Sequence, residues 1–387
     1  MSITHSSSSA PSTSTSTPAP ASAIPAAPAP TVTPARRAER SRARRNTLIV
    51  AAFALALALT AVAALGVGRL AVPFDTAAAI IVDQLAELVG LDTSLAADAT
   101  AAEASAVWLI RAPRVVLAVI VGAALAVSGA VLQSLFRNPL VSPDVIGVSS
   151  AASFGGVLTI LLGAGGVWLV SGAFVAGLTA ALLVLVLGRL RTGSPILTIV
   201  LGGIVISALF NALVSLVTYL ADPYTTLPSI TFWLMGSFAS TTWSHAATAV
   251  LPILPCLLVV FALRWRVNLL SLGDDEARSL GIRPERLRML LIVTVSLLTA
   301  ATVAVAGVIG WVGLVIPHLV RLVLGSDNRV LLPASGLLGG LYLLLMDTLA
   351  RSVVEVEIPV GILTAIIGAP VFVFLLVSKA KGGISHA

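Results

Sequence analysis

Long apolar runs alternate with short polar segments from Asn46 almost to the end of the chain. A bilayer core of ~30 Å is crossed by about 20 residues of helix, and most of the runs have about that length. The pattern therefore predicts an all-α fold with about ten membrane-spanning helices. Residues 226–239 are apolar but too short to span, so we expect them at the outer surface or dipping into the bundle. The expected spans are residues 46–68, 114–136, 144–163, 166–188, 195–220, 245–263, 289–309, 311–325, 330–350 and 360–378.

The run from Met289 to Leu324 is too long for one span and short for two. It contains three glycines at intervals of three, and glycine is the weakest helix former after proline. We predict a full helix, a bend at the glycines and then a shorter helix. A histidine in this shorter helix is either a buried proton relay or a structural anchor near the inner interface. The residues assigned to this gating or structural segment are Gly307, Gly310, Gly313, Pro317, His318 and Arg321.

The composition excludes an ordinary soluble domain. The 387 residues are 58% hydrophobic and 10% charged, with a mean hydropathy of +1.05, whereas about 25% charged is usual in soluble domains. Residues 1–45 are mainly Ser, Thr, Ala and Pro and end in a cluster of arginines. We expect a disordered cytoplasmic tail there, followed by a transmembrane domain over residues 46–380. A cleaved signal peptide is the alternative, but the first apolar run exceeds the roughly 7–15 residues of a signal core.

The basic residues indicate an orientation. With the N-terminus in the cytoplasm and ten crossings, all but four of the 23 Lys and Arg residues fall in inner segments, as the positive-inside rule requires. Residues 71–107 contain acids but no basic residue and are expected outside. Because the positive charge is spread over loops, it does not indicate nucleic-acid binding. We expect a multi-pass protein of the cell membrane with both termini in the cytoplasm. The four outer exceptions are Arg69, Arg111, Arg114 and Arg351.

The sequence lacks the usual signatures of catalysis. Its only lysines, Lys379 and Lys381, belong to no phosphate loop, and no serine lies in a GxSxG motif. The four histidines show no metal-ligand spacing, and the single cysteine, Cys256, cannot form a disulfide within the chain. We therefore predict no enzymatic activity, no metal site and no cofactor in this chain.

The loop from Arg264 to Arg288 predicts a short amphipathic helix beneath the membrane. Asp274 is placed to cap it, acids follow in its first turn, and Gly281 is placed to end it. Ala277 and Leu280 are expected to share one face. A solvated loop needs no such order, so the pattern favours a docking surface for a soluble partner over an unstructured connection.

Two of the expected helices carry stripes with a spacing of four. Small residues form a packing ridge on the second helix at Ala118, Gly122, Ala126 and Ala130. The fifth helix carries a polar stripe, and polar side chains in a membrane seldom face lipid. This second stripe either lines a pathway or makes hydrogen bonds between helices. Its members are Gly203, Ser207, Asn211 and Ser215.

Asp347 is the only acid well inside an expected span, and Arg351 follows it by four residues. This order and spacing favour an ion pair along the helix. An ion-coupled secondary transporter is an alternative class for the chain, but such proteins are expected to use several intramembrane carboxylates or broken helices near the midplane.

Five strings of the sequence closely resemble the permease subunits of ABC importers for iron-siderophore complexes, haem and vitamin B12. The resemblance covers roughly residues 50–378 and leaves out the Ser/Thr/Pro tail. The strings are RAPRVVLAVIVGAALAVSGAVLQSLFRNPLVSPDVIGVSSAASFG from Arg111, LGDDEARSLGI from Leu272, the segment through GSDNRVLLP, DTLAR from Asp347 and EIPVGILTAIIGAPVF from Glu357.

The resemblance implies ten helices per subunit, with two permeases side by side in the membrane lipid and a pathway between them. It also implies two ATP-binding subunits below, which carry ATP and Mg²⁺, and an extracytoplasmic binding protein above. A ferric-siderophore-type chelate is the expected cargo, with haem or cobalamin as alternatives.

The resemblance also assigns roles to three sets of residues. The docking set for the binding protein is Arg111, Arg114 and Arg351. The pathway set is Ser207, Asn211 and Ser215. The helix that couples to the ATPase is Asp274, Asp275, Glu276, Ala277, Arg278, Ser279, Leu280, Gly281 and Ile282.

Overall fold

The computed structural model describes residues 34–189 and 195–384, and all of the regular elements in these residues are helical. The chain divides between Arg44 and Arg45 into an N-terminal part and a larger part that holds every helix except the start of α1. The elements are α1 (Pro34–Gly66), α2 (Phe74–Leu88), α3 (Ala101–Ser105), the π-helical η1 (Ala106–Arg111), α4 (Ala112–Leu135), the 3-10 turn η2 (Pro143–Ile146), α5 (Val148–Leu161), α6 (Val167–Arg189), α7 (Pro195–Leu220), α8 (Thr226–Leu234), α9 (Trp243–Leu272), α10 (Asp274–Ser279), α11 (Pro284–Ala306), α12 (Val312–Leu324), α13 (Asn328–Ser352) and α14 (Val360–Ile384).

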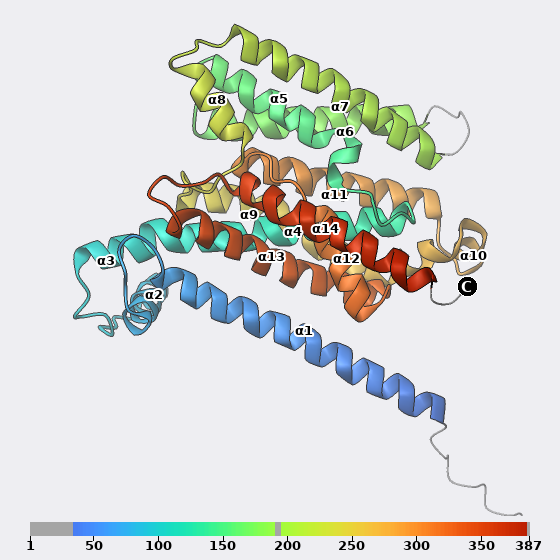
Figure 1. Ribbon diagram of the computed structural model, residues 1–387, viewed down its shortest axis with the longest axis horizontal. Helices are drawn as coiled ribbons and strands as arrows, with labels where there is room; N and C mark the ends of the chain where they lie inside the picture. The colour runs from blue at the N-terminus through green and yellow to red at the C-terminus, as the bar shows by residue number, and fades with distance from the viewer. Residues whose placement is uncertain (1–33, 190–194, 385–387) are drawn as a thin grey trace, which may run out of the picture. The chain divides into compact units, whose positions relative to one another are not determined.

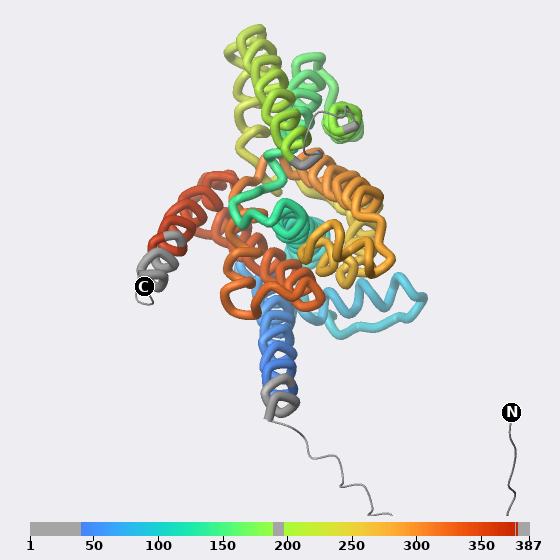
Figure 2. The backbone as a smooth tube through the Cα atoms, turned by 90° about the vertical axis from the view of Figure 1, so that its right-hand side faces the viewer, coloured from blue at the N-terminus to red at the C-terminus, as the bar shows by residue number. Residues whose placement is uncertain are grey.

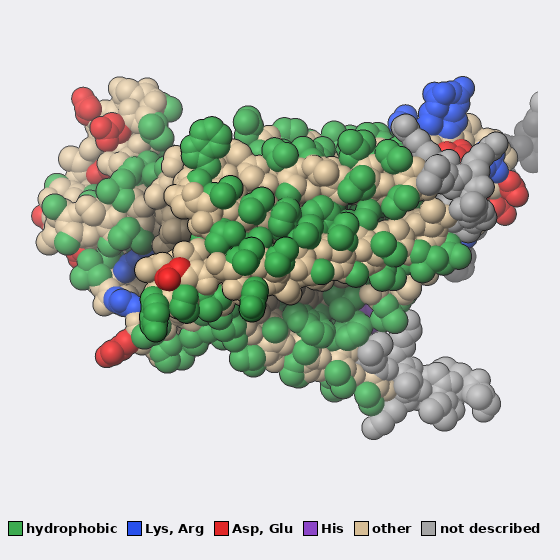
Figure 3. All heavy atoms as spheres, turned by 90° about the horizontal axis from the view of Figure 1, so that it is seen from above, with side chains coloured by type: hydrophobic (Ala, Val, Ile, Leu, Met, Phe, Trp, Pro, Cys, Tyr) green, Lys and Arg blue, Asp and Glu red, His purple; other side chains and the backbone are tan. Residues whose placement is uncertain are grey.

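Seven helical segments among the described residues are long and apolar enough to cross a membrane, and three shorter apolar helices occupy the remaining expected spans. The prediction of an all-α membrane protein with about ten spanning helices is confirmed. The space-filling view agrees, because its charged side chains gather toward two opposite ends and hydrophobic side chains cover much of the surface between them (Figure 3). The three shorter helices are Val148–Leu161, Val312–Leu324 and Val360–Leu375.

The structure differs from the sequence expectation near the N-terminus. The tail was expected to be disordered to residue 45, but α1 already begins at Pro34. Its first residues are largely Ala, Arg and Glu, which are good helix formers. The rest of the expected tail, residues 1–33, lies outside the described residues.

The segment expected outside the membrane, residues 71–107, is mostly helical. It contains α2 and α3, and α3 runs through η1 into α4. A capping box starts α3, because the Thr100 side chain accepts from the Glu103 amide and the Glu103 carboxylate accepts from the Thr100 amide. The Thr-x-x-Glu spacing is a sequence signal for the start of a helix. The prediction for this segment relied on its polar composition and did not include this helix.

Helix α4 is the central packing element, and its predicted ridge of small residues is confirmed as buried. A Cβ atom on Gly122 would lie 2.3 Å from the carbonyl oxygen of Gly339 on α13, and one on Gly129 would lie 1.7 Å from that of Gly313 on α12. Only residues without a side chain allow the backbones to approach so closely. The glycines therefore fix α4 against both helices.

Most of the long helices in the larger part of the chain pack in two groups. Helices α5, α6, α7 and α8 pack together, and α11 connects them to a second group around α4, α9, α12 and α13 (Figures 1 and 2). Figure 1 places α2 and α3 at one end of this second group and α10 at the opposite end. The segment expected outside the membrane and the loop expected in the cytoplasm therefore lie at opposite ends, as the sequence analysis predicts.

The predicted break in the long apolar run is also confirmed. Helix α11 ends at Ala306, and Gly307 has φ 67° and ψ −161°, a conformation open only to glycine. Trp311 then adopts a positive φ of 71° before α12 begins. The chain thus turns sharply between a full-length helix and a short one.

Candidate functional site

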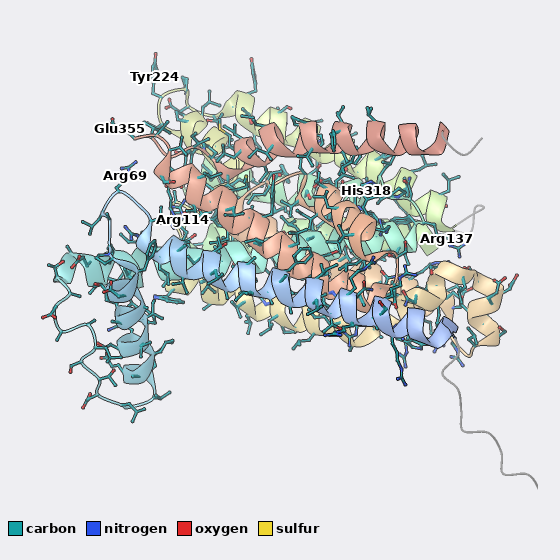
Figure 4. All side chains as sticks on the ribbon, turned by 60° about the horizontal axis from the view of Figure 1, so that its bottom comes forward. Arg69, Arg114, Arg137, Tyr224, His318 and Glu355 are labelled. Atoms are coloured by element: carbon teal, nitrogen blue, oxygen red, sulfur yellow. The ribbon has the colours of Figure 1, made fainter. Side chains whose placement is uncertain are left out.

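Buried charged residues join α4, α13 and the segment before α14. Arg114, at the start of α4, donates from Nε to Oδ1 of Asp347 on α13 at 2.7 Å, and from Nη1 to Oε2 of Glu357 at 3.1 Å. Arg114 lies at the same end of the bundle as Arg69 and Glu355 (Figure 4). A buried charge is stable only when it is paired and hydrogen-bonded. One arginine that binds two acids therefore holds these three segments together.

Two further arginines bind the end of α1. Arg111 Nη1 donates to the carbonyl oxygens of Leu65 at 2.6 Å and Gly66 at 3.0 Å, and Arg351 Nη1 donates to that of Val67 at 2.7 Å. The second terminal nitrogen of each guanidinium makes another bond of this kind. The last carbonyl groups of a helix have no partner within the helix, and cations are favourable there. Both arginines thus cap α1.

The ion pair expected between Asp347 and Arg351 is present only as a long contact. Arg351 Nε lies 3.6 Å from Asp347 Oδ2, whereas Arg114 from another helix takes the carboxylate at 2.7 Å. Spacing along a helix predicts only local partners, and here a residue 233 positions away in the sequence is closer. Asp347 is therefore a tertiary anchor within the protein.

The three arginines assigned to docking are mostly buried. Arg111 and Arg114 are 5% exposed and Arg351 is 9% exposed. They nevertheless line one cavity of about 330 Å³ together with Arg69 and Glu357. Any external acidic group would reach them through this cavity, and their docking role remains a prediction.

The short helix expected in the cytoplasmic loop is present as α10, but its cap differs. Gly273 occupies the N-cap position, and no side chain accepts a hydrogen bond from the first turn. The Asp274 carboxylate instead binds Arg288, whose Nη1 donates to Asp274 Oδ2 at 2.8 Å. Hydrogen bonding from Arg288 lowers the pKa of Asp274 below its usual value. Asp274 is the first residue of the helix and lies one position after the N-cap, so its carboxylate pairs with Arg288 and does not cap the helix.

Ala277 and Leu280 do not share an exposed face. Ala277 is fully buried against the protein, whereas Leu280 is 57% exposed. Gly281 follows with φ +80° and donates to the carbonyl oxygen of Arg278, so it ends the helix as predicted. Arg278 is tied to Asp275 and Glu285. Leu280, the C-cap residue of α10, is thus an apolar side chain that is available to another protein.

The residues of the polar stripe on α7 have different surroundings, because some pack against the protein and others are exposed. Gly203 packs against the backbone before α5, since a Cβ there would lie 2.2 Å from the Val145 carbonyl oxygen. Ser207 is half-buried, while Asn211 and Ser215 are exposed. The Ser215 hydroxyl donates to the Asn211 carbonyl oxygen at 3.0 Å, within its own helix. Two polar side chains of an apolar span are therefore left uncovered by this chain.

Gln133 connects the gating segment to α4, and the sequence did not single it out. Pro317 has no N–H, so the Gly313 carbonyl lacks its usual partner within α12. Gln133 Nε2 donates to that carbonyl oxygen and to the one of Leu314, both at 3.3 Å, and Arg321 Nη1 donates to Gln133 Oε1 at 2.8 Å. Because Pro317 follows Gly313 by four residues, the sequence already indicates that the Gly313 carbonyl oxygen needs a hydrogen-bond donor from outside α12.

His318 on α12 is buried, and its ring centroid is 6.3 Å from that of Phe372 on α14. Figure 4 shows it toward the end of the bundle where Arg137 is labelled, away from Arg69 and Arg114. Within residues 34–189 and 195–384, no group of three His, Cys, Asp or Glu residues could hold a metal ion.

The apolar helices define a multi-pass membrane protein. It has an apolar span with uncovered polar groups, a short helix followed by an exposed leucine at one end, and an arginine-lined cavity at the other. The sequence profile of the FecCD transport family matches residues 56–378. The chain belongs to this family, and it is a permease of the ABC-importer type.

Known proteins similar to this chain support the assignment. The molybdate import system permease protein MolB of Haemophilus influenzae is 41% identical over 84% of this chain and 94% of its own length. The hemin transport system permease protein HmuU of Yersinia pestis is 42% identical over 71% of this chain and 84% of its own length. A solved chain, 40% identical with a TM-score of 0.76, covers 86% of this chain and 99% of its own. It is described as an inward-facing ABC transporter assigned to the metal-chelate type.

Proposed function

We propose that this permease moves a ferric-siderophore-type chelate into the cell through a pathway that it forms with a second permease subunit. The observation that carries this proposal is the polar face of α7, where Asn211 and Ser215 are uncovered on an apolar span. Polar groups in a membrane seldom face lipid, so this face belongs at an interface or a pathway. Ser207, half-buried on the same stripe, continues it.

The chemistry of this face favours a bulky metal complex as the cargo. The relatives are named for cargoes as different as molybdate and hemin, and the solved transporter is assigned to metal chelates. Pores that select small anions use rings of Arg or Lys. Residues 195–220 contain no charged residue. Hydroxyl and amide groups on an apolar wall suit a chelate whose ligand shell already neutralises the metal.

The two ends of the molecule suit the remaining partners. The outer cavity carries Arg69, Arg111, Arg114 and Arg351, so it is complementary to acidic residues of an extracytoplasmic binding protein. At the opposite end, exposed Leu280 suits a groove of one of two ATP-binding subunits, which would carry ATP and Mg²⁺.

Coupling would then pass from α10 through Pro284 into α11 and across the Gly307 break into α12. ATP binding can drive the exchange of outward and inward openings only through contacts that differ between the two states. The break at Gly307 and the short α12 give the bundle an element that can change its tilt.

Uptake in a deletion strain tests this function. The strain is complemented with the wild-type permease or with Asn211→Leu/Ser215→Leu, and uptake is measured separately for labelled ferric siderophores, hemin, cobalamin and molybdate. We expect ferric-siderophore uptake that needs the partner ATPase and falls at least about tenfold in the variant. Ile204→Leu, on an exposed apolar position of the same helix, is the control.

Three results would overturn parts of the proposal. If the permease restores uptake of only hemin, cobalamin or molybdate, that compound is the cargo and the assignment to ferric siderophores is wrong. If the double variant takes up the cargo as fast as wild type, the polar face of α7 does not line the pathway. Uptake that survives an inactive ATPase but stops when the proton gradient is collapsed would make the protein an ion-coupled transporter.

A further inference from the structure

A second cavity of about 460 Å³ lies beside the cytoplasmic loop, between the end of α9, the residues after α10 and the start of α11. Its walls combine arginines with apolar residues and contain no acid. The lining residues are Trp265, Arg266, Leu269, Leu280, Gly281, Ile282, Arg283, Arg286, Leu287 and Leu290.

The arginines of this cavity differ from their neighbours in the same loop. Arg278 and Arg288 form ion pairs with acids of the loop. In contrast, none of the three arginines that line the cavity lies within ion-pair distance of an acid in residues 34–189 and 195–384. All three are exposed, and they come from two different helices and the connection between them. Three positive charges therefore converge on one cavity without a counter-charge.

The apolar side of the cavity extends toward the membrane. Leu287 and Leu290 belong to α11, which is long and apolar enough to span, and Leu290 is exposed. Trp265 is exposed near the end of α9, and tryptophan is enriched where a span meets the aqueous phase. A ligand that fills the whole cavity must carry a negative head and an apolar chain.

We infer that this cavity binds the headgroup of an anionic phospholipid of the inner leaflet, with Arg266, Arg283 and Arg286 around its phosphate and Leu287 and Leu290 along its acyl chains. Basic pockets between spanning helices at the cytoplasmic side are known to suit such lipids. An acidic segment of the ATP-binding subunit would match the arginines but not the apolar wall, which includes Leu287 and the exposed Leu290 on α11. The inference needs a chain that spans the membrane with this loop on the inner side, and it is independent of the cargo. The lipid and the ATP-binding subunit would share this loop, because Leu280 lines the cavity and is also the contact proposed for that subunit.

Lipid retention by the purified permease tests this site. The permease is mixed in detergent with equimolar phosphatidylglycerol and phosphatidylcholine, and bound lipid is counted by native mass spectrometry. We expect wild type to prefer phosphatidylglycerol. Each basic residue near an anionic surface contributes about a factor of five, so Arg266→Gln/Arg283→Gln/Arg286→Gln should lower this preference at least about tenfold.

The matched control is Arg42→Gln/Arg44→Gln/Arg45→Gln, which removes the same charge from exposed positions of α1. It should keep the preference. An equal loss in both variants would mean general charge attraction, and an unchanged preference in the cavity variant would mean no site; either result overturns the inference.

Two further experiments test whether the cavity binds something other than a lipid. If excess inorganic phosphate alone removes the preference of wild type, the cavity is a small-anion site. If the cavity variant keeps its lipid preference but loses association with the purified ATP-binding subunit, the cavity belongs to that subunit. Retained folding is checked by size-exclusion chromatography, and Leu290→Ser provides a second variant that should weaken retention of lipid without changing charge.

Discussion

Arg114 on α4 and Asp347 on α13 form a buried ion pair with a separation of 2.7 Å between helices that are distant in sequence. The same guanidinium also binds Glu357 before α14. Asp347 is the acid that would have to move protons or ions in a secondary transporter, yet the structure places it in a fixed contact beside a cation. This arrangement favours anchoring over ion coupling.

Replacing Asp347 with asparagine should destabilise the protein strongly, because Arg114 would lose one of its two counter-charges in a buried position. Breaking such a pair typically costs about 3–5 kcal/mol, and the remaining Glu357 should hold the loss near the lower value. The measurement is thermal unfolding in detergent. Glu355→Gln, the same change at an exposed position, is the control and should be nearly neutral. Equal melting temperatures for both variants would disprove the anchoring role.

Arg111 can be tested for its two roles separately, because it caps α1 and also lines the cavity that it shares with Arg114 and Arg351. Arg111→Lys keeps the charge, but one ammonium group cannot reproduce the planar fork that reaches several carbonyl groups. We expect a lower melting temperature with binding-protein affinity largely kept at low salt. Arg111→Gln should lose both stability and affinity. Unchanged affinity in the glutamine variant would show that this arginine serves α1 alone.

The sequence predicted the spans and the break at Gly307 because both depend on local properties, namely run length and the conformational freedom of glycine. It also predicted the ridge on α4, since a spacing of four places small residues on one face. It could not predict the partner of Asp347, which comes from a distant helix.

The sequence also could not predict which residues in and next to α10 are buried and which are exposed. A helix of six residues has too little periodicity to show that Ala277 is buried and Leu280 exposed. Gln133 was overlooked because one polar residue near the end of a span resembles an ordinary interface residue. Its role depends on Pro317, which is far away in the sequence.

Gly129→Ala should separate α4 from α12. The added Cβ would lie 1.7 Å from the Gly313 carbonyl oxygen, which is backbone and cannot rotate away. Overpacking of this kind costs about 1–3 kcal/mol or more. Gly165→Ala is the control, because nothing lies within 4 Å of a Cβ at that position. The melting temperature should fall only in the first variant, and a similar small effect in both would contradict the close approach of the helices.

The contact between Gln133 and Gly313 can be isolated by a double-mutant cycle. Gln133→Glu keeps an oxygen for Arg321 but removes the amide that donates to the Gly313 carbonyl, and we expect a loss on the order of 1 kcal/mol. Pro317→Ala restores an N–H four residues after Gly313, so the same Gln133→Glu change should cost less in that background. Unfolding in detergent gives the coupling energy, which we expect at roughly 0.5–1.5 kcal/mol. Additive effects would mean that Gln133 does not replace the missing N–H.

Leu280→Asp should separate the permease from its ATPase without unfolding it. Leu280 is 57% exposed, so a charge there remains solvated in the isolated permease, whereas Ala277→Asp would bury a charge and unfold the loop. We expect the melting temperature to stay within about 2 °C of wild type, while affinity for the ATP-binding subunit falls at least about tenfold, as for an apolar anchor at an interface. Leu272→Asp is the matched control, because Leu272 ends α9 nearby with the same 57% exposure. If binding-assay affinities fall equally in both variants, the added charge acts through the general field of this surface, and Leu280 is not the contact that couples nucleotide binding to transport.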